Sequence, residues 1–142
     1  MCIQKILNLF IKDEEPREES GLWLYTKLKT LFPEAEIFIS DSDNYRLCNL
    51  DDINAFLKAD LTDKIKYETN RMDCDDFASR LHGQFSTPPY SDLAVGKVWT
   101  DKHALNCLID QNGEFWFIEP QTDELLSDLA EWQGNEIRFI EI

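Results

Sequence analysis

Two observations predict that the sequence folds as an α+β protein. The chain has 142 residues, 43% of them hydrophobic, which is enough for one domain with its own core. Apolar side chains recur at helical spacing in the first half and alternate with polar ones after residue 94. Because helices come first and strands follow, we expect N-terminal helices packed on a C-terminal antiparallel β-sheet.

The first 19 residues differ from the rest of the chain. Residues 3–11 carry apolar side chains at the spacing of an amphipathic helix. We expect this helix to pack on its own domain, and docking on a partner or covering an active site are the alternatives. Residues 13–19 are charged except for Pro16, which is typical of a solvated linker. The predicted domain therefore covers residues 20–142.

Three longer helices are predicted within this domain. Ser20 is the predicted N-cap of a helix that ends before Pro33, and Asn49 or Asp51 caps a second helix. A third helix begins near Cys74. The expected strands are 36–40, 94–100, 104–110, 114–119 and 137–142, with a short helix over 125–132.

The chain is strongly acidic. Lys and Arg total 14 against 28 Asp and Glu, so the formal net charge is -14. This charge repels nucleic-acid phosphates and anionic membranes, and we therefore expect no direct nucleic-acid partner. It is compatible with solubility alone, with binding of a divalent cation, or with imitation of a nucleic acid.

Several features favour a cytoplasmic location. No apolar run reaches the ~20 residues that a membrane span needs, and residues 1–12 lack a small-residue cleavage site. The four cysteines are Cys2, Cys48, Cys74 and Cys107. They show no CxxC spacing, which argues against a zinc site or a disulfide framework. We expect free thiols in a reducing cytoplasm.

Cys74 stands between Asp73 and the pair Asp75 and Asp76, at the expected start of a helix. A helix start favours the nucleophilic thiolate, whereas three neighbouring carboxylates disfavour it. A bound cation would remove this conflict by neutralising the carboxylates. A second run of oxygen ligands covers residues 119–124, and the two runs together offer the donors that Ca²⁺ or Mn²⁺ prefers.

A cysteine nucleophile needs a base within reach and a group that orients the base. His82 lies two turns along the same helix and is too far away, which leaves His103. Glu119 can orient His103 in only one of two strand registers. A two-residue turn at Asn112 and Gly113 puts the two side chains on opposite faces, whereas a three-residue loop with a left-handed Gly113 makes them diagonal neighbours on one face.

Each of these residues also has an ordinary interpretation. A cysteine near a helix start is often buried and inert. His103 follows two charged residues, as in an exposed loop, and Glu119 precedes Pro120, as at the end of a strand. Acidic runs are also typical of solvated surfaces. The residues alone therefore leave both catalysis and a plain structural role open.

Four motifs together carry a resemblance to a known family: DCDDFA at 73–78, VWT at 98–100, HALN at 103–106 and WFIEPQTDE at 116–124. They resemble the papain-like C-terminal domain of the Marasmius agglutinin, and similar motifs occur in small phage and bacterial proteins. The resemblance covers residues 70–124 and implies a papain-like fold.

The resemblance also implies a Ca²⁺-activated cysteine protease with a Cys-His-Glu triad. Cys74 would be the nucleophile, His103 the general base and Glu119 the acid that orients it. Residues beside the cysteine and after the Glu-Pro pair would hold calcium. The implied candidate ligands are Asp73, Asp75, Asp76, Gln121, Asp123 and Glu124.

The sequence departs from this family in two respects. It has no lectin β-trefoil, so the resemblance does not imply sugar binding. A papain-like site usually draws an oxyanion-hole donor from a glutamine before the nucleophile, but no glutamine lies between Gln4 and Gln84. Backbone N–H groups or Asn70 would serve instead. Transglutaminase-like acyl transfer is an alternative to hydrolysis.

We therefore expect a cation-dependent thiol hydrolase or peptidase that acts on a peptide, isopeptide or amide bond in a protein or peptide. The rival hypothesis is a non-enzymatic, acidic phage-type protein that binds a host protein or mimics a nucleic acid. The enzyme predicts a reactive Cys74, whereas the rival predicts a buried and unreactive one.

Overall fold

The computed structural model describes residues 16–41 and 43–142, so the amphipathic helix predicted over residues 3–11 lies outside the described part. The helices are α2 (Gly21–Leu31), α3 (Leu50–Ala59) and α4 (Cys74–Phe85), with the 3-10 turns η1 (Thr62–Lys64) and η2 (Glu131–Gln133). The strands are β1 (Glu18–Ser20), β2 (Glu36–Phe38), β3 (Asn44–Arg46), β4 (Val95–Thr100), β5 (Ala104–Ile109), β6 (Phe115–Glu119), β7 (Glu124–Leu126) and β8 (Ile137–Glu141).

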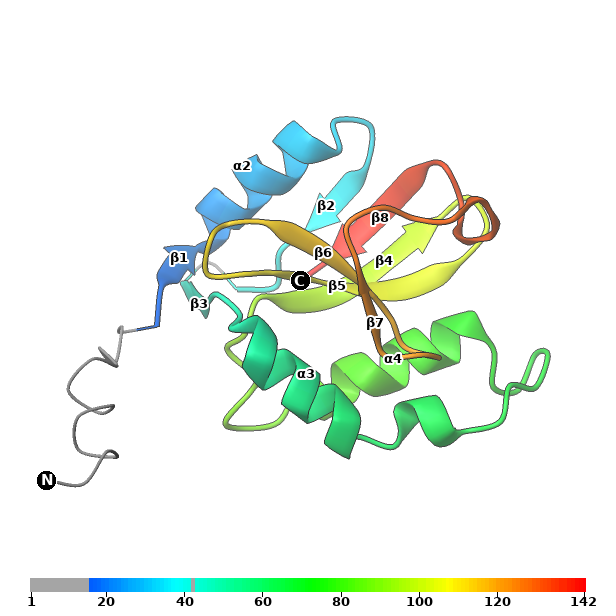
Figure 1. Cartoon of the computed structure of the whole chain (residues 1–142). Helices are drawn as coiled ribbons and strands as arrows, with labels where there is room; N and C mark the ends of the chain where they lie inside the picture. Colours follow the sequence, from blue (N-terminus) through cyan, green and yellow to red (C-terminus); the bar gives the residue numbers. More distant parts are fainter. Residues whose placement is uncertain (1–15, 42) are drawn as a thin grey trace, which may run out of the picture.

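Six of the strands form one sheet in the order β2-β8-β4-β5-β6-β7 (Figure 1). Most neighbours in this sheet are antiparallel, as predicted. The prediction of a purely antiparallel sheet is wrong at one edge, where β2 runs parallel to β8. A parallel pair needs a long crossover connection, and here it spans residues 39–136, a pairing that local sequence patterns cannot show. The protein is therefore α+β with a mixed sheet.

The helix predicted over residues 125–132 does not form. After β6, the backbone N–H groups of Thr122 and Asp123 donate to the carbonyl of Glu119 at 3.2 and 2.9 Å, and Asp123 has a positive φ of 63°. This turn returns the chain beside β6 as the edge strand β7. The apolar side chains of this segment pack on the sheet, so their spacing reflects a strand and the turn η2.

Helix starts follow the predicted capping. The Ser20 hydroxyl accepts a hydrogen bond from the Trp23 N–H at 3.1 Å, which satisfies one of the free donors at the start of α2. At α3, the side-chain oxygen of Asn49 accepts from the Asp52 N–H at 3.1 Å. Of the two predicted caps, Asn49 is therefore the one used.

The helices cover both faces of the sheet, with α2 on one face and α3 and α4 on the other (Figure 1). Leu24 and Leu28 of α2 pack with Val98 and Leu105. On the opposite face, apolar side chains of α3 and α4 pack against apolar side chains of the strands. The helices contribute Ile53, Leu57, Leu81 and Phe85, and the strands contribute Val95, Leu108 and Ile118. Each fully buried side chain of this size stabilises the fold by roughly 1.5–3 kcal/mol. The apolar side of α4 thus holds it against the sheet.

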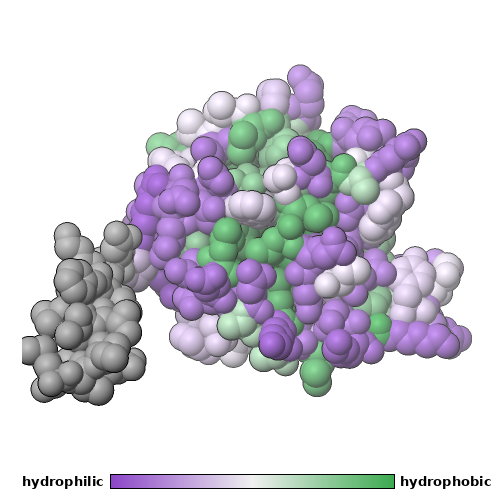
Figure 2. Space-filling view, viewed as in Figure 1, coloured by the Kyte–Doolittle hydropathy of each residue, from purple (hydrophilic) through white to green (hydrophobic). Residues whose placement is uncertain are grey.

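The surface of the described residues has hollows, two of them of several hundred Å³. One of about 840 Å³ lies beside the end of α4 and includes Phe56, Phe85 and Tyr90 in its wall. The other, of about 660 Å³, lies between α2 and β6 and includes Phe32 and Phe115. Figure 2 shows apolar side chains forming a band across this side of the molecule, within a largely hydrophilic surface. Across residues 16–41 and 43–142, no helix has both the length and the hydropathy to cross a membrane.

Candidate active site

Helix α4 and strand β5 run in the same direction, and this brings their starts together. The Asn106 amide donates to the carbonyl of Ala78 at 2.9 Å. Farther along, Leu81 of α4 packs in the same cluster as Leu108 of β5. Cys74 lies one turn before Ala78, and His103 directly precedes β5. The nucleophile and base predicted from the sequence therefore lie at the same end of the helix and strand, on the right in Figure 1.

The start of α4 is held by its own acidic residues. The Asp73 N–H donates to the Asp76 carboxylate at 3.2 Å, and the Asp73 carboxylate accepts from the Asn70 N–H at 3.1 Å. Asn70 has a positive φ of 62°, so the chain turns sharply before the helix. These bonds fix Cys74 at the first position of α4, where it is half-buried. Asp73 and Asp76 thus have a capping role whether or not they bind a cation.

His103 and Glu119 form a buried pair. Their side chains are 6% and 2% exposed, and His103 Nε2 lies 2.8 Å from Glu119 Oε2. The register of β5 and β6 allows this contact. Gly113 has a positive φ of 77°, and the Asp110 N–H donates to the Glu114 carbonyl at 2.9 Å. This is the three-residue loop, the one register in which a contact between His103 and Glu119 was predicted.

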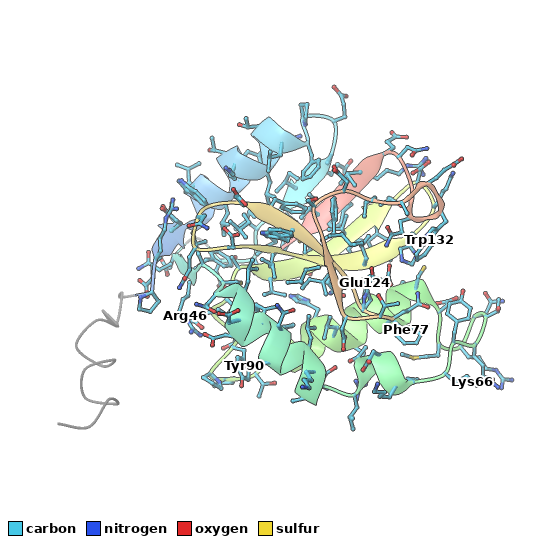
Figure 3. The ribbon with its side chains drawn as sticks, in the orientation of Figure 1. Arg46, Lys66, Phe77, Tyr90, Glu124 and Trp132 are labelled. Atoms are coloured by element: carbon cyan, nitrogen blue, oxygen red, sulfur yellow. The ribbon has the colours of Figure 1, made fainter. Side chains whose placement is uncertain are left out.

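Two further residues contact this pair, and neither was predicted from the sequence. Gln133 is 2% exposed, and its amide nitrogen donates to Glu119 Oε2 at 2.9 Å. The Trp132 ring stands edge-on to the His103 ring, with centroids 4.9 Å apart. Figure 3 labels Trp132 at the same end of the sheet as the start of α4. Both residues lie in η2, which begins inside the segment 125–132 that was predicted to be a helix and ends one residue beyond it.

The hydrogen bonds indicate the tautomer of His103. The Gln133 side-chain oxygen accepts from the Ala130 N–H at 2.8 Å, so the Gln133 amide nitrogen must face Glu119. Glu119 Oε2 is an acceptor for Gln133, and it accepts equally from His103 Nε2–H. His103 Nδ1 is then the ring nitrogen left to exchange a proton with a thiol or a substrate.

The predicted metal ligands divide into separate groups. Oxygen atoms of Asp73, Asp75 and Asp76 all lie within 4.8 Å of one another. Asp123 instead interacts with Asp63 and Asp60, and burial, together with these negative neighbours, raises the pKa of Asp123 to about 6. Carboxylate oxygens are suitable donors for a hard cation such as Ca²⁺, so the cluster at the start of α4 matches that chemistry.

The other two predicted ligands lie close to the buried pair. The Gln121 N–H donates to Glu119 Oε1 at 3.4 Å. Glu124 is the partner of Glu119 in the β6–β7 ladder and is exposed. Neither side chain belongs to the three-carboxylate cluster found in the described part of the chain.

Two other cysteines provide a contrast to Cys74. Cys48 and Cys107 are free thiols that are 1% and 0% exposed. Burial raises the pKa of Cys48 to about 12 and also raises the pKa of Cys107. Both are therefore inert thiols of the core. Neither of the two surface hollows is lined by Cys74, His103 or Glu119.

Comparison with known proteins identifies the fold. No protein-family model and no curated protein matches the sequence. The PSL1a–E64 complex is similar, with a TM-score of 0.75 at 20% identity over 88% of this chain and 50% of that one. The Polyporus squamosus lectin bound to the human-type influenza-binding epitope Neu5Acα2-6Galβ1-4GlcNAc gives 0.73 at 18% identity, over 88% and 49%. The chain thus has the fold of about half of each of these chains.

Proposed function

We propose that this domain is a cysteine hydrolase that cleaves a peptide, isopeptide or amide bond. Cys74 gives its thiol proton to His103 Nδ1, and its sulfur attacks the substrate carbonyl carbon. His103 then passes the proton to the leaving amine, and a thioester remains on Cys74. Water, deprotonated by His103, attacks the thioester, which releases the acid and restores the thiol.

The single observation that carries the proposal is the buried bond between His103 and Glu119. A carboxylate that accepts from Nε2–H orients the imidazole and stabilises the imidazolium that forms during proton transfer. Burying a histidine lowers the stability of the fold unless its ring nitrogens are hydrogen-bonded. Its location at the end of the sheet where Cys74 begins α4 supports a role as the base for that thiol.

We include a bound Ca²⁺ ion near Cys74 in this proposal. Asp73, Asp75 and Asp76 supply oxygen donors beside Cys74, and the resemblance adds Gln121, Asp123 and Glu124 as ligand candidates. A bound Ca²⁺ would lower the negative potential around the sulfur. Mn²⁺ is a second cation with the same preference for oxygen ligands.

The test is alkylation of Cys74 at pH 6, with and without Ca²⁺. E64, present in one of the similar structures, is an epoxide that a thiolate opens, so it serves as the probe beside iodoacetamide. We expect rapid, Ca²⁺-dependent labelling that disappears in Cys74→Ala. The buried Cys48 is an internal control that should stay unlabelled. Equally slow labelling of Cys74 in both conditions would contradict the hydrolase.

Carbohydrate binding is a second candidate, favoured by the similarity to a lectin bound to a sialylated trisaccharide. About half of that chain has no counterpart here, so the sugar site of the lectin need not lie in the shared half. Titration of the ¹⁵N-labelled chain with the same trisaccharide separates the hypotheses. Saturable chemical-shift changes would favour sugar binding. If there are no such changes and thiol labelling is slow, a non-enzymatic acidic protein that binds a host protein becomes the leading hypothesis.

A further inference from the structure

Gln133 is an unusual residue for its location. It lies in the short turn η2 between β7 and β8, where its neighbours Glu131 and Trp132 are exposed, yet it is itself 2% exposed. Burying a polar amide is unfavourable unless its groups are hydrogen-bonded. Here both ends are satisfied, by Glu119 at 2.9 Å and by the Ala130 N–H at 2.8 Å. The Gln133 amide therefore connects the turn to the acid of the candidate site.

Gln133 limits how the Glu119 carboxylate can turn. The same oxygen, Oε2, accepts from Gln133 at 2.9 Å and lies 2.8 Å from His103 Nε2. Rotation of the carboxylate away from His103 would also break the bond to Gln133. The amide cannot follow by flipping, because its oxygen would then face the carboxylate and its nitrogen would face the Ala130 N–H.

Thr100 joins the backbones that carry the base and the amide. Its hydroxyl oxygen accepts from the His103 N–H at 2.9 Å and the same hydroxyl donates to the Gln133 carbonyl. Figure 3 shows the neighbouring Trp132 projecting from the same turn. The imidazole, the carboxylate and the amide are thus tied together by both side-chain and backbone bonds.

We infer that Gln133 is a positioning residue for the candidate site. It holds Glu119 in the orientation that keeps the proton of His103 on Nε2 and leaves Nδ1 as the proton acceptor. This inference rests on the proposed function for its catalytic meaning, but the geometric part concerns only Gln133, Glu119 and His103.

The experiment measures the imidazole tautomer by two-bond ¹H–¹⁵N NMR at pH 8. It uses the Cys74→Ala chain, in which no thiolate can draw a second proton onto the ring, and a His82→Asn variant assigns the only other histidine. We expect protonated Nε2 and unprotonated Nδ1. Gln133→Met, which loses both bonds, and Gln133→Glu, which keeps an acceptor for Ala130, should both give a mixture of tautomers.

The same substitutions in the chain that retains Cys74 should slow its alkylation at pH 6 by roughly tenfold, the size expected for one lost hydrogen bond to a charged group. Gln84→Met and Gln84→Glu make the same changes at an exposed position and should have no effect. Backbone amide spectra establish that each variant is folded.

Three results would overturn parts of this account, each in a different way. Gln133 variants with the wild-type tautomer and rates within twofold would refute positioning. A normal tautomer in Gln133→Glu but not in Gln133→Met would show that the residue only holds the loop at Ala130. Slow alkylation of the unsubstituted chain would reject the hydrolase, while the tautomer in the Cys74→Ala chain still decides the role of Gln133.

Discussion

Two groups of polar side chains lie near the starts of α4 and β5, and they are built in opposite ways. His103, Glu119 and Gln133 are buried and bonded to one another at 2.8 and 2.9 Å. The carboxylates of Asp73, Asp75 and Asp76 crowd within 4.8 Å. In the part of the chain that the structure describes, no Lys or Arg forms an ion pair with these three.

The two groups differ in what stabilises them. Contacts formed on folding stabilise the buried group, whereas a bound cation would stabilise the acidic group. Each polar atom that joins the buried group has a partner within the protein, so that group is complete on folding. Like charges at the start of α4 repel one another; backbone N–H groups bonded to Asp73 and Asp76 offset part of this repulsion, and a cation would offset more. A substitution in the first group should therefore act on stability, whereas one at Asp75, which takes no part in the capping bonds of Asp73 and Asp76, should act on cation dependence.

The largest expected effect is that of Glu119→Leu. Removing the carboxylate leaves two buried donors, His103 Nε2–H and the Gln133 amide, without a partner, and each unsatisfied donor costs about 1–3 kcal/mol. Glu124→Leu is the matched control, because Glu124 lies opposite Glu119 on β7 but is exposed. In EDTA, urea denaturation followed by tryptophan fluorescence should show a change below about 0.5 kcal/mol for the control. Equal losses of unfolding free energy in the two variants would show that the buried carboxylate stabilises the fold no more than an exposed one.

Calcium should have the next largest effect. A ligand at 100 times its dissociation constant raises the free energy of unfolding by about 2.7 kcal/mol. We expect Ca²⁺ to raise the melting temperature and Asp75→Asn to reduce the rise, while Asp92→Asn, at an exposed carboxylate paired with Arg46, leaves it intact. KCl at equal ionic strength controls for screening. A rise that persists in Asp75→Asn would locate the ion elsewhere.

The sequence was sufficient to predict most of the elements. Periodicity alone predicted the strands at 94–100, 104–110 and 114–119, and every end lies within one residue of the ends of β4, β5 and β6. It failed where pairing is not local, as at β2 and β8. It also failed over 125–132, because the turn at Glu119 decides that this segment returns along β6.

The candidate site was predictable to a similar extent. His103 and Glu119 were predicted because a reactive cysteine needs a base and the strand register could be enumerated. Gln133 could not be predicted, because it comes 14 residues after Glu119, on an irregular turn, with no motif around it. The grouping of Asp123 with Asp63 and Asp60 was missed for the same reason, since it depends on how η1 packs.

Asp123 allows a smaller test of the acidic residues, based on how the free energy of unfolding changes with pH. Its pKa is raised to about 6 in the folded protein by burial and by Asp63, whereas an unfolded aspartate titrates near pH 4. The folded state therefore binds the proton more tightly, and this residue lowers the free energy of unfolding as pH rises from about 4 to 6. Solvent screens the half-exposed carboxylate, so we expect a loss of about 1 kcal/mol.

The measurement for this residue compares Asp123→Asn with the unsubstituted chain in EDTA. Urea denaturation at pH 4, 5, 6 and 7 should show the variant gaining stability relative to the parent between pH 4 and 6, with no further gain above pH 7. Asp92→Asn should show no such gain, because its Arg46 partner lowers the pKa of Asp92. A constant difference across the pH range would mean that Asp123 titrates normally.

Trp132→Ala should have the smallest effect, and it tests how much Trp132 shields the buried group of His103, Glu119 and Gln133 from solvent. Trp132 is 59% exposed, so its burial contributes little, and what remains is the contact with His103. Aromatic pairs contribute about 0.5–1.5 kcal/mol, and we expect the lower end here. Trp132→Phe keeps an aromatic edge and should recover most of the loss in the same denaturation assay. A loss above about 2 kcal/mol in Trp132→Ala would mean that η2 is a packed part of the core, and that Gln133 is held by more than its two hydrogen bonds.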